Sequence, residues 1–176
     1  MKPRLARLAV RCCALLLSGL GLVAASAGQV AEPAPDSLAA VPDADPLELA
    51  SRCARLGDEA VLQRLSPQTA LPERLAAVRA TVFLRAPELA LPALAELAGS
   101  RDPDLAPAAS RRALTVVQAL AVEGLARREL SPASLLPVRA RLSQLASAAQ
   151  LRPDLRALAS EAAHLLGTLG VPGAKG

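Results

Sequence analysis

The sequence predicts an all-α protein built from stacked antiparallel helical hairpins, and three observations support this prediction. Hydrophobic residues make up 52% of the 176 residues, and beyond residue 45 Leu and Ala, both strong helix formers, dominate over β-branched residues. No stretch alternates apolar and polar residues as a half-buried strand does. Pro and Gly recur where helices would begin and end, with short links between them that make neighbouring helices antiparallel. An irregular helical bundle is the alternative architecture.

The first 27 residues have the pattern of a secretory signal peptide. Four basic residues (Lys2, Arg4, Arg7 and Arg11) precede an apolar run that ends in Ala25-Ser26-Ala27. The run is shorter than the about 20 residues that span a bilayer. We therefore expect cleavage before Gly28 and a periplasmic or secreted protein. An uncleaved N-terminal membrane anchor is the alternative.

Cleavage would change the charge balance of the chain. The signal contains four of the 20 basic residues and none of the 16 acidic ones, so the net charge of +4 falls to zero in the mature chain. Without a basic excess or stacking aromatic residues, no nucleic-acid partner is expected. Residues 28–45 are rich in Pro, Ala and Asp, and we predict a flexible tether there.

Seven helical segments are predicted in the domain 46–170, followed by a disordered tail at 171–176. Asp45 and Pro46 have the residue types of an N-cap and a first helical position. Pro92, Pro107 and Pro137 lie deeper and should shorten or bend their helices. Glycines are expected to end helices at Gly57, Gly99, Gly124 and Gly167. The segments are 46–56, 58–65, 72–85, 87–98, 103–122, 132–148 and 153–167.

Two segments show a clear division into an apolar and a polar face. Residues 153–167 place Leu155, Leu158, Ala159, Ala162, Leu165, Leu166 and Leu169 at helical spacing. Residues 103–122 are expected to direct Leu105, Ala109, Ala113, Val116, Val117 and Leu120 inward. Cys53 is the single cysteine outside the signal, which excludes an internal disulfide in the mature chain and indicates a buried thiol or an intermolecular one.

The region from Leu47 to Gly170 resembles HEAT-like (HEAT/armadillo class) repeat proteins. The resemblance rests on 91–97 (LPALAEL), 101–104 (RDPD), Val78-Arg79 and 163–170 (AHLLGTLG). In that family a turn Asp and a second-helix Arg form a ladder between repeats, and Arg79 fits the place of such an Arg. The resemblance implies about three stacked hairpins with a binding face and no catalytic residues.

No catalytic, cofactor or metal site is predicted. His164 is the only histidine, no Gly-x-Ser-x-Gly motif is present, and one His with one distant Cys fits no zinc site. Asp102 and Asp104 are interpreted as helix-start residues. Arg pairs such as Arg111-Arg112 are interpreted as solvated faces that could also grip an acidic partner or lipid headgroups.

The sequence therefore favours a non-enzymatic, exported interaction scaffold with an unknown protein partner. The alternative is a structural helical bundle held at the membrane by the uncleaved N-terminal segment; a membrane partner is expected only in that case. Partner binding is assigned to outward-facing residues of the second helices. These are Arg79, Arg111, Arg112, Thr115, Gln118, Glu161 and His164.

Overall fold

A computed structural model describes residues 36–41 and 45–173, all of which belong to one compact unit, Pro33–Gly176. Within these residues the chain is helical and contains no strand. The α-helices are α1 (Pro46–Leu56), α2 (Asp58–Gln63), α3 (Leu71–Ala80), α4 (Leu91–Leu97), α5 (Leu105–Glu123), α6 (Leu136–Ser147) and α7 (Pro153–Thr168). Short 3₁₀ helices are η1 (Leu38–Ala40), η2 (Thr81–Phe83), η3 (Pro87–Ala90), η4 (Leu125–Arg128) and η5 (Pro132–Leu135). The all-α prediction is confirmed.

The predicted capping residues begin the helices as expected. The Asp45 Oδ1 atom accepts a hydrogen bond from the Glu48 backbone N–H at 2.9 Å at the start of α1. Asp102 Oδ1 accepts from the backbone N–H groups of Asp104 at 3.0 Å and Leu105 at 2.8 Å. Each carboxylate thereby satisfies donors that a helix N-terminus leaves unpaired.

The glycine predictions hold in part. Gly57 ends α1 and Gly124 ends α5, with φ values of 81° and 80° that side chains disfavour. The prediction that Gly167 ends its helix is wrong, because α7 continues to Thr168. The residue with a left-handed φ after α7 is Gly170, at 81°. The helix continues past Gly167 while Leu165, Leu166 and Leu169 still pack against the core.

Two of the three deep prolines, Pro92 and Pro137, shorten the helices that contain them, whereas Pro107 does not shorten α5. Pro92 and Pro137 each occupy the second position of an α-helix, α4 and α6, and a 3₁₀ turn precedes each helix. The expected segments 87–98 and 132–148 are therefore divided in two, because proline has no N–H to continue a helix from the preceding turn. Pro107 lies in the first turn of α5, where a missing donor costs nothing.

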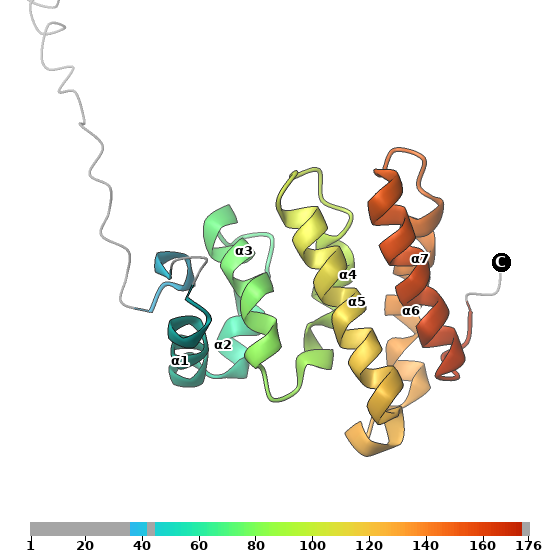
Figure 1. The fold of residues 1–176 in the computed structure, drawn as a ribbon, viewed down its shortest axis with the longest axis horizontal. Helices are drawn as coiled ribbons and strands as arrows, with labels where there is room; N and C mark the ends of the chain where they lie inside the picture. Colours follow the sequence, from blue (N-terminus) through green and yellow to red (C-terminus); the bar gives the residue numbers. More distant parts are fainter. Residues whose placement is uncertain (1–35, 42–44, 174–176) are drawn as a thin grey trace, which may run out of the picture. The chain divides into compact units, whose positions relative to one another are not determined.

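The helices form two layers of packed pairs. Figure 1 shows α3, α5 and α7 side by side, with α4 behind α5 and α6 behind α7. Helix pairs α4–α5 and α6–α7 are hairpins with short connections, and α5 packs against both α4 and α7. The core between the layers consists of Leu, Val and Ala, and the fully buried alanines allow α-helices to approach closely.

Residues 36–41 differ from the predicted flexible tether, because they pack onto the domain. Leu38 is 0% exposed and Val41 is 4% exposed. The Glu73 carboxylate of α3 accepts hydrogen bonds from the backbone N–H groups of Leu38 at 3.0 Å and Ala39 at 2.9 Å. Apolar periodicity could not reveal this segment, which is too short to show a period. The folded domain thus begins before residue 46.

The C-terminal boundary also differs from the prediction. Val171, assigned above to a disordered tail, is 1% exposed, and its carbonyl accepts a hydrogen bond from Arg139 Nη1. Burial of an apolar side chain beyond the last helix extends the domain past residue 170. The expected signal peptide and residues 174–176 lie outside the described residues. Among the described helices, none combines the length and hydropathy that a membrane span requires.

Candidate functional site

The seven residues assigned to partner binding all lie on the layer formed by α3, α5 and α7. Arg79 is on α3, Arg111, Arg112, Thr115 and Gln118 are on α5, and Glu161 and His164 are on α7. Five of these side chains are exposed, while Arg79 and Arg112 are partly buried. The helical phase inferred from sequence is thus correct for α5 and α7. We call the surface formed by these seven residues the second-helix face.

At the boundary of α3 and α5, the second-helix face contains a cavity of about 220 Å³. Its walls are Val78 and Arg79 from α3 and Ala108, Arg111, Arg112 and Thr115 from α5. The Thr115 hydroxyl donates a 2.9 Å hydrogen bond to the Arg111 backbone carbonyl. This bond holds the hydroxyl against its own helix. The arginines therefore supply the charge of this cavity, and the wall includes no carboxylate.

At the boundary of α5 and α7, the face is polar and includes one carboxylate, that of Glu161. The Gln118 side-chain amide donates a 3.3 Å hydrogen bond to Glu161 Oε1. His164 follows Glu161 by about one helical turn and is exposed. The structure thereby brings the seven residues into two groups, one cationic beside α3 and one of mixed polarity beside α7.

A second cavity, of about 210 Å³, adjoins the first and shares Arg79 and Arg112 with it. Its remaining wall is mostly apolar, with Leu38, Leu49, Val82 and Phe83 among the lining residues. Val82 is 49% exposed and Phe83 is 37% exposed. Sequence analysis missed Phe83. Phe83 is the only Phe, Tyr or Trp residue in the chain, and this rarity could have marked it as a candidate binding residue.

Arg112 is the most strongly desolvated arginine of this face. Burial lowers the pKa of its guanidinium below the ordinary value, because water solvates the charged form less well in a recess. A guanidinium remains protonated at any physiological pH even so. The side chain consequently carries a positive charge in a position where it is poorly hydrated.

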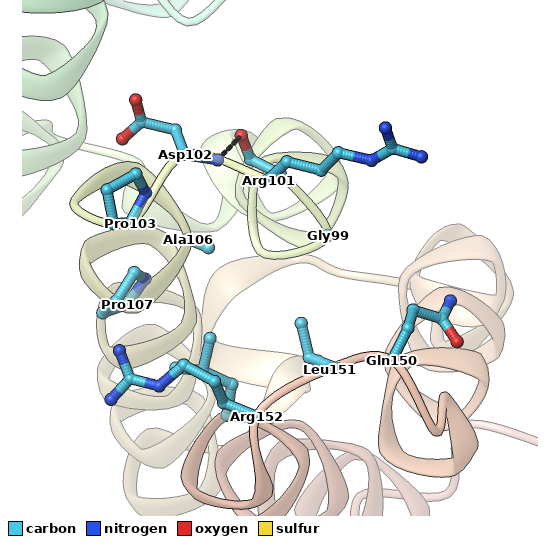
Figure 2. Close-up of a pocket in the computed structure, with 11 residues that line it drawn as sticks. Gly99, Arg101, Asp102, Pro103, Ala106, Pro107, Gln150, Leu151 and Arg152 are labelled. Carbon is cyan, nitrogen blue, oxygen red and sulfur yellow. Dashed lines mark hydrogen bonds between the residues drawn. The ribbon is translucent and has the colours of Figure 1, made fainter.

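A cavity of about 530 Å³ lies away from the predicted residues. It is formed between the α4–α5 and α6–α7 connections, and its lining includes Gly99, Ala106, Leu151 and Arg152 (Figure 2). In Figure 2 the Asp102 carboxylate is directed away from the cavity, where it caps α5.

Of the two arginines that line this cavity, Arg152 is paired, and Arg101 makes no hydrogen bond or ion pair among the described residues. Arg152 donates two hydrogen bonds to the Asp154 carboxylate, at 3.1 and 2.8 Å. These bonds lower the pKa of Asp154 below its ordinary value. The lining is therefore mixed, because small and apolar groups lie beside the ion-paired Arg152, the exposed Arg101 and the polar residues Ser100 and Gln150.

Ion pairs join several neighbouring elements of the fold. Arg141 of α6 lies 3.1 Å from a Glu96 carboxylate oxygen of α4. Arg128 lies 2.5 Å from Glu123 and 3.9 Å from the buried Glu88. Sequence analysis identified none of these pairs, because they join residues that are distant along the chain or lie in different turns.

Cys53 is 4% exposed, which confirms the buried alternative for this thiol. Burial, followed by the negative charge of Asp58, raises the pKa of Cys53 above its ordinary value. A thiol with a raised pKa is a weak nucleophile at neutral pH. Among the described residues, no group of three or more His, Cys, Asp and Glu side chains is arranged to hold a metal ion.

Comparison with family models, with curated proteins and with solved structures gives no match for this chain.

Proposed function

We propose that this protein is an exported, non-enzymatic scaffold that binds a protein partner through the second-helix face. The observation that carries the proposal is the convergence of seven polar and charged residues on three adjacent helices of one layer. The apolar sides of α5 and α7 are buried against other helices, so the outward side chains do not contribute to the core. Side chains released from packing in this way can be used for recognition.

The resemblance to HEAT-like repeats supports the same reading. In such proteins, each hairpin contacts its neighbours, and the stack presents a row of second helices as an extended binding surface. Here α3, α5 and α7 would be those second helices. We propose a short HEAT-like solenoid, and the function follows from the surface that its stacking would create.

Site-specific photo-crosslinking in the organism that makes the protein tests this proposal. A photoreactive phenylalanine analogue would be placed at Thr115 or Gln118 on the second-helix face. Matched controls would carry it at Ser143 or Gln144, which are exposed on α6 in the other layer. We expect one discrete adduct of higher mass from the first pair of positions and little from the control pair.

Adducts of equal yield from both layers would contradict the proposal, as would adducts only from α6. Folding of each variant would be checked by circular dichroism and thermal melting, since exposed helical positions tolerate large side chains. A variant that melts as the wild type does and gives no adduct at Thr115 or Gln118 counts against this face.

The alternative function is a structural bundle tethered to the membrane. It needs the N-terminal 27 residues to remain attached, and it needs no partner on the second-helix face. We propose instead that the protein is exported and released as a free mature chain. The basic start, the apolar run and the Ala25-Ser26-Ala27 sequence fit a cleavable signal.

A further inference from the structure

We infer that the segment recognised by the second-helix face is acidic and carries one bulky apolar side chain. Its carboxylates would bind Arg111 and Arg112, and its apolar side chain would enter the cavity beside Phe83. This inference rests on the function proposed above and specifies the chemistry of the partner.

Arg111 and Arg112 have no counter-ion within residues 36–41 and 45–173. Neither guanidinium makes a hydrogen bond or an ion pair there. Most other arginines with such contacts are paired with carboxylates. These are Arg52, Arg55, Arg64, Arg128, Arg141 and Arg152. Arg85, Arg101 and Arg156 also lack such contacts among the described residues. Arg111 and Arg112 differ from them because they are adjacent and line one cavity together.

Arg112 loses part of its hydration in its recess, which costs free energy. Its charge is desolvated without a compensating partner, and a carboxylate brought to it would replace the lost hydration. Guanidinium groups favour carboxylates because two parallel N–H donors match the two oxygens. Binding a carboxylate there would therefore gain more than binding one to a fully hydrated surface arginine.

The cavity that shares Arg112 with the cationic one is lined mainly by apolar side chains. Its one acidic residue, Asp45, already accepts a hydrogen bond from the Glu48 backbone N–H. Val82 and Phe83 retain large exposed fractions, 49% and 37%, although both are hydrophobic. Aromatic residues and arginines are enriched among residues that dominate binding energy at protein interfaces. The two adjoining cavities would take a charged group and an apolar group that are close together on one chain.

A protein segment fits these features better than an anionic lipid surface does. A flat negatively charged bilayer would have to cover the whole face, including the exposed carboxylate of Glu161 on α7, whereas a short acidic segment at the α3–α5 boundary would not contact it. The arginines also line hollows between helices, where a single side chain can enter and a flat surface cannot. We therefore assign the face to an acidic segment of a protein.

The test is a binding titration with three labelled synthetic peptides. The first has one leucine flanked on each side by glutamates, the second replaces the leucine with serine, and the third replaces the glutamates with glutamine. The protein is residues 28–176, which include the whole compact unit. We compare it with an R111Q/R112Q variant and with an R101Q/R127Q control, whose two arginines are exposed and lie outside the second-helix face.

We expect the leucine–glutamate peptide to bind the wild type and the control equally, and R111Q/R112Q about tenfold or more weakly. The serine peptide should bind more weakly than the leucine peptide, and the glutamine peptide least. Raising the salt concentration should weaken binding of the acidic peptides, because exposed charges are screened. Circular dichroism of each variant verifies folding.

Equal binding by R111Q/R112Q and the wild type would overturn the inference, as would equal binding of the glutamine peptide. Equal affinities for the leucine and serine peptides would overturn its apolar part. Arginine-dependent binding to phosphatidylglycerol vesicles with no binding to any peptide would assign the face to lipid instead. If the peptides fail while crosslinks still concentrate at Thr115 and Gln118, the partner chemistry is wrong and the proposed function stands.

Discussion

At the residue scale, Glu73 shows how one carboxylate can attach a chain segment to a helix. Its two oxygens accept hydrogen bonds from the Ser37 hydroxyl at 2.8 Å, from two backbone N–H groups and from Arg64 Nε at 2.9 Å. Burial by itself would raise the pKa of Glu73. The hydrogen bonds outweigh it and lower the pKa below the ordinary value of 4.5. The charged form is therefore part of the folded state.

Replacing Glu73 with Gln should destabilise the protein by about 1–3 kcal/mol at pH 7, because an amide offers one acceptor where the carboxylate offers two. The effect should depend on pH. Since the folded-state pKa of Glu73 is lowered, its contribution is complete above the ordinary value of 4.5 and is lost as the pH falls through the folded pKa. Urea unfolding between pH 7 and pH 3 measures both effects.

The matched control is E59Q, on the exposed surface of α2, for which a change within about 0.5 kcal/mol is expected. If E73Q and the wild type differ by a constant amount across the whole acidic range, Glu73 does not act through its ionised form.

At the scale of the element, α7 shows the strength and the limit of reading a helix face from periodicity. Leu155, Ala159, Ala162 and Leu166 are buried as predicted. Leu158, Leu165 and Leu169 from the same predicted stripe are only partly buried, and Ala163 is buried although it lay outside that stripe. The contact surface is therefore rotated toward Ala163, because α7 packs against both α5 and α6.

The rotated face predicts unequal costs for leucine truncation along α7. Leu166→Ala should destabilise the protein by about 2–5 kcal/mol, because Leu166 is 0% exposed and its loss leaves a cavity. Leu158→Ala should cost less, since part of that side chain already contacts water. Val122→Ala, at a position 87% exposed, should change stability by less than about 0.5 kcal/mol. Thermal and urea unfolding of the three variants measures these costs. If Leu158→Ala lost more stability than Leu166→Ala, the buried face of α7 would be wrongly placed.

At the scale of the whole molecule, the folded unit begins earlier than the periodic helices do. Leu38 and Val41 are buried together with the core of α1 and α3, although residues 36–41 lie in a Pro/Ala/Asp-rich stretch. Cleavage before Gly28 would leave every described residue attached. The mature chain that we propose therefore keeps the segment that Glu73 holds.

The mature N terminus separates a free scaffold from an anchored bundle. Intact-mass analysis of the exported protein should show a chain that begins at Gly28, because small residues two apart precede that position. A mass that includes Met1 or Lys2, recovered from the membrane fraction, would instead establish the anchored form. A variant with Ala25 and Ala27 both changed to Leu should accumulate uncleaved and serve as the control.

The sequence by itself determined the helical class, the positions of most helix starts and stops, and the outward side of α5 and α7. These are local properties: a cap such as Asp45, a proline in a first turn and a 3.6-residue period act within one helix. Five exposed members of the second-helix face follow from helical phase alone.

Only the tertiary structure decided which residues meet across helices. The cavity shared by Arg79 and Arg112, the exposure of Phe83 beside it and the attachment of residues 36–41 to Glu73 all join parts of the chain separated by one or more helices. The proximity of these residues depends on how close the small alanine side chains let the helices approach. No periodic signal in a single sequence encodes that distance.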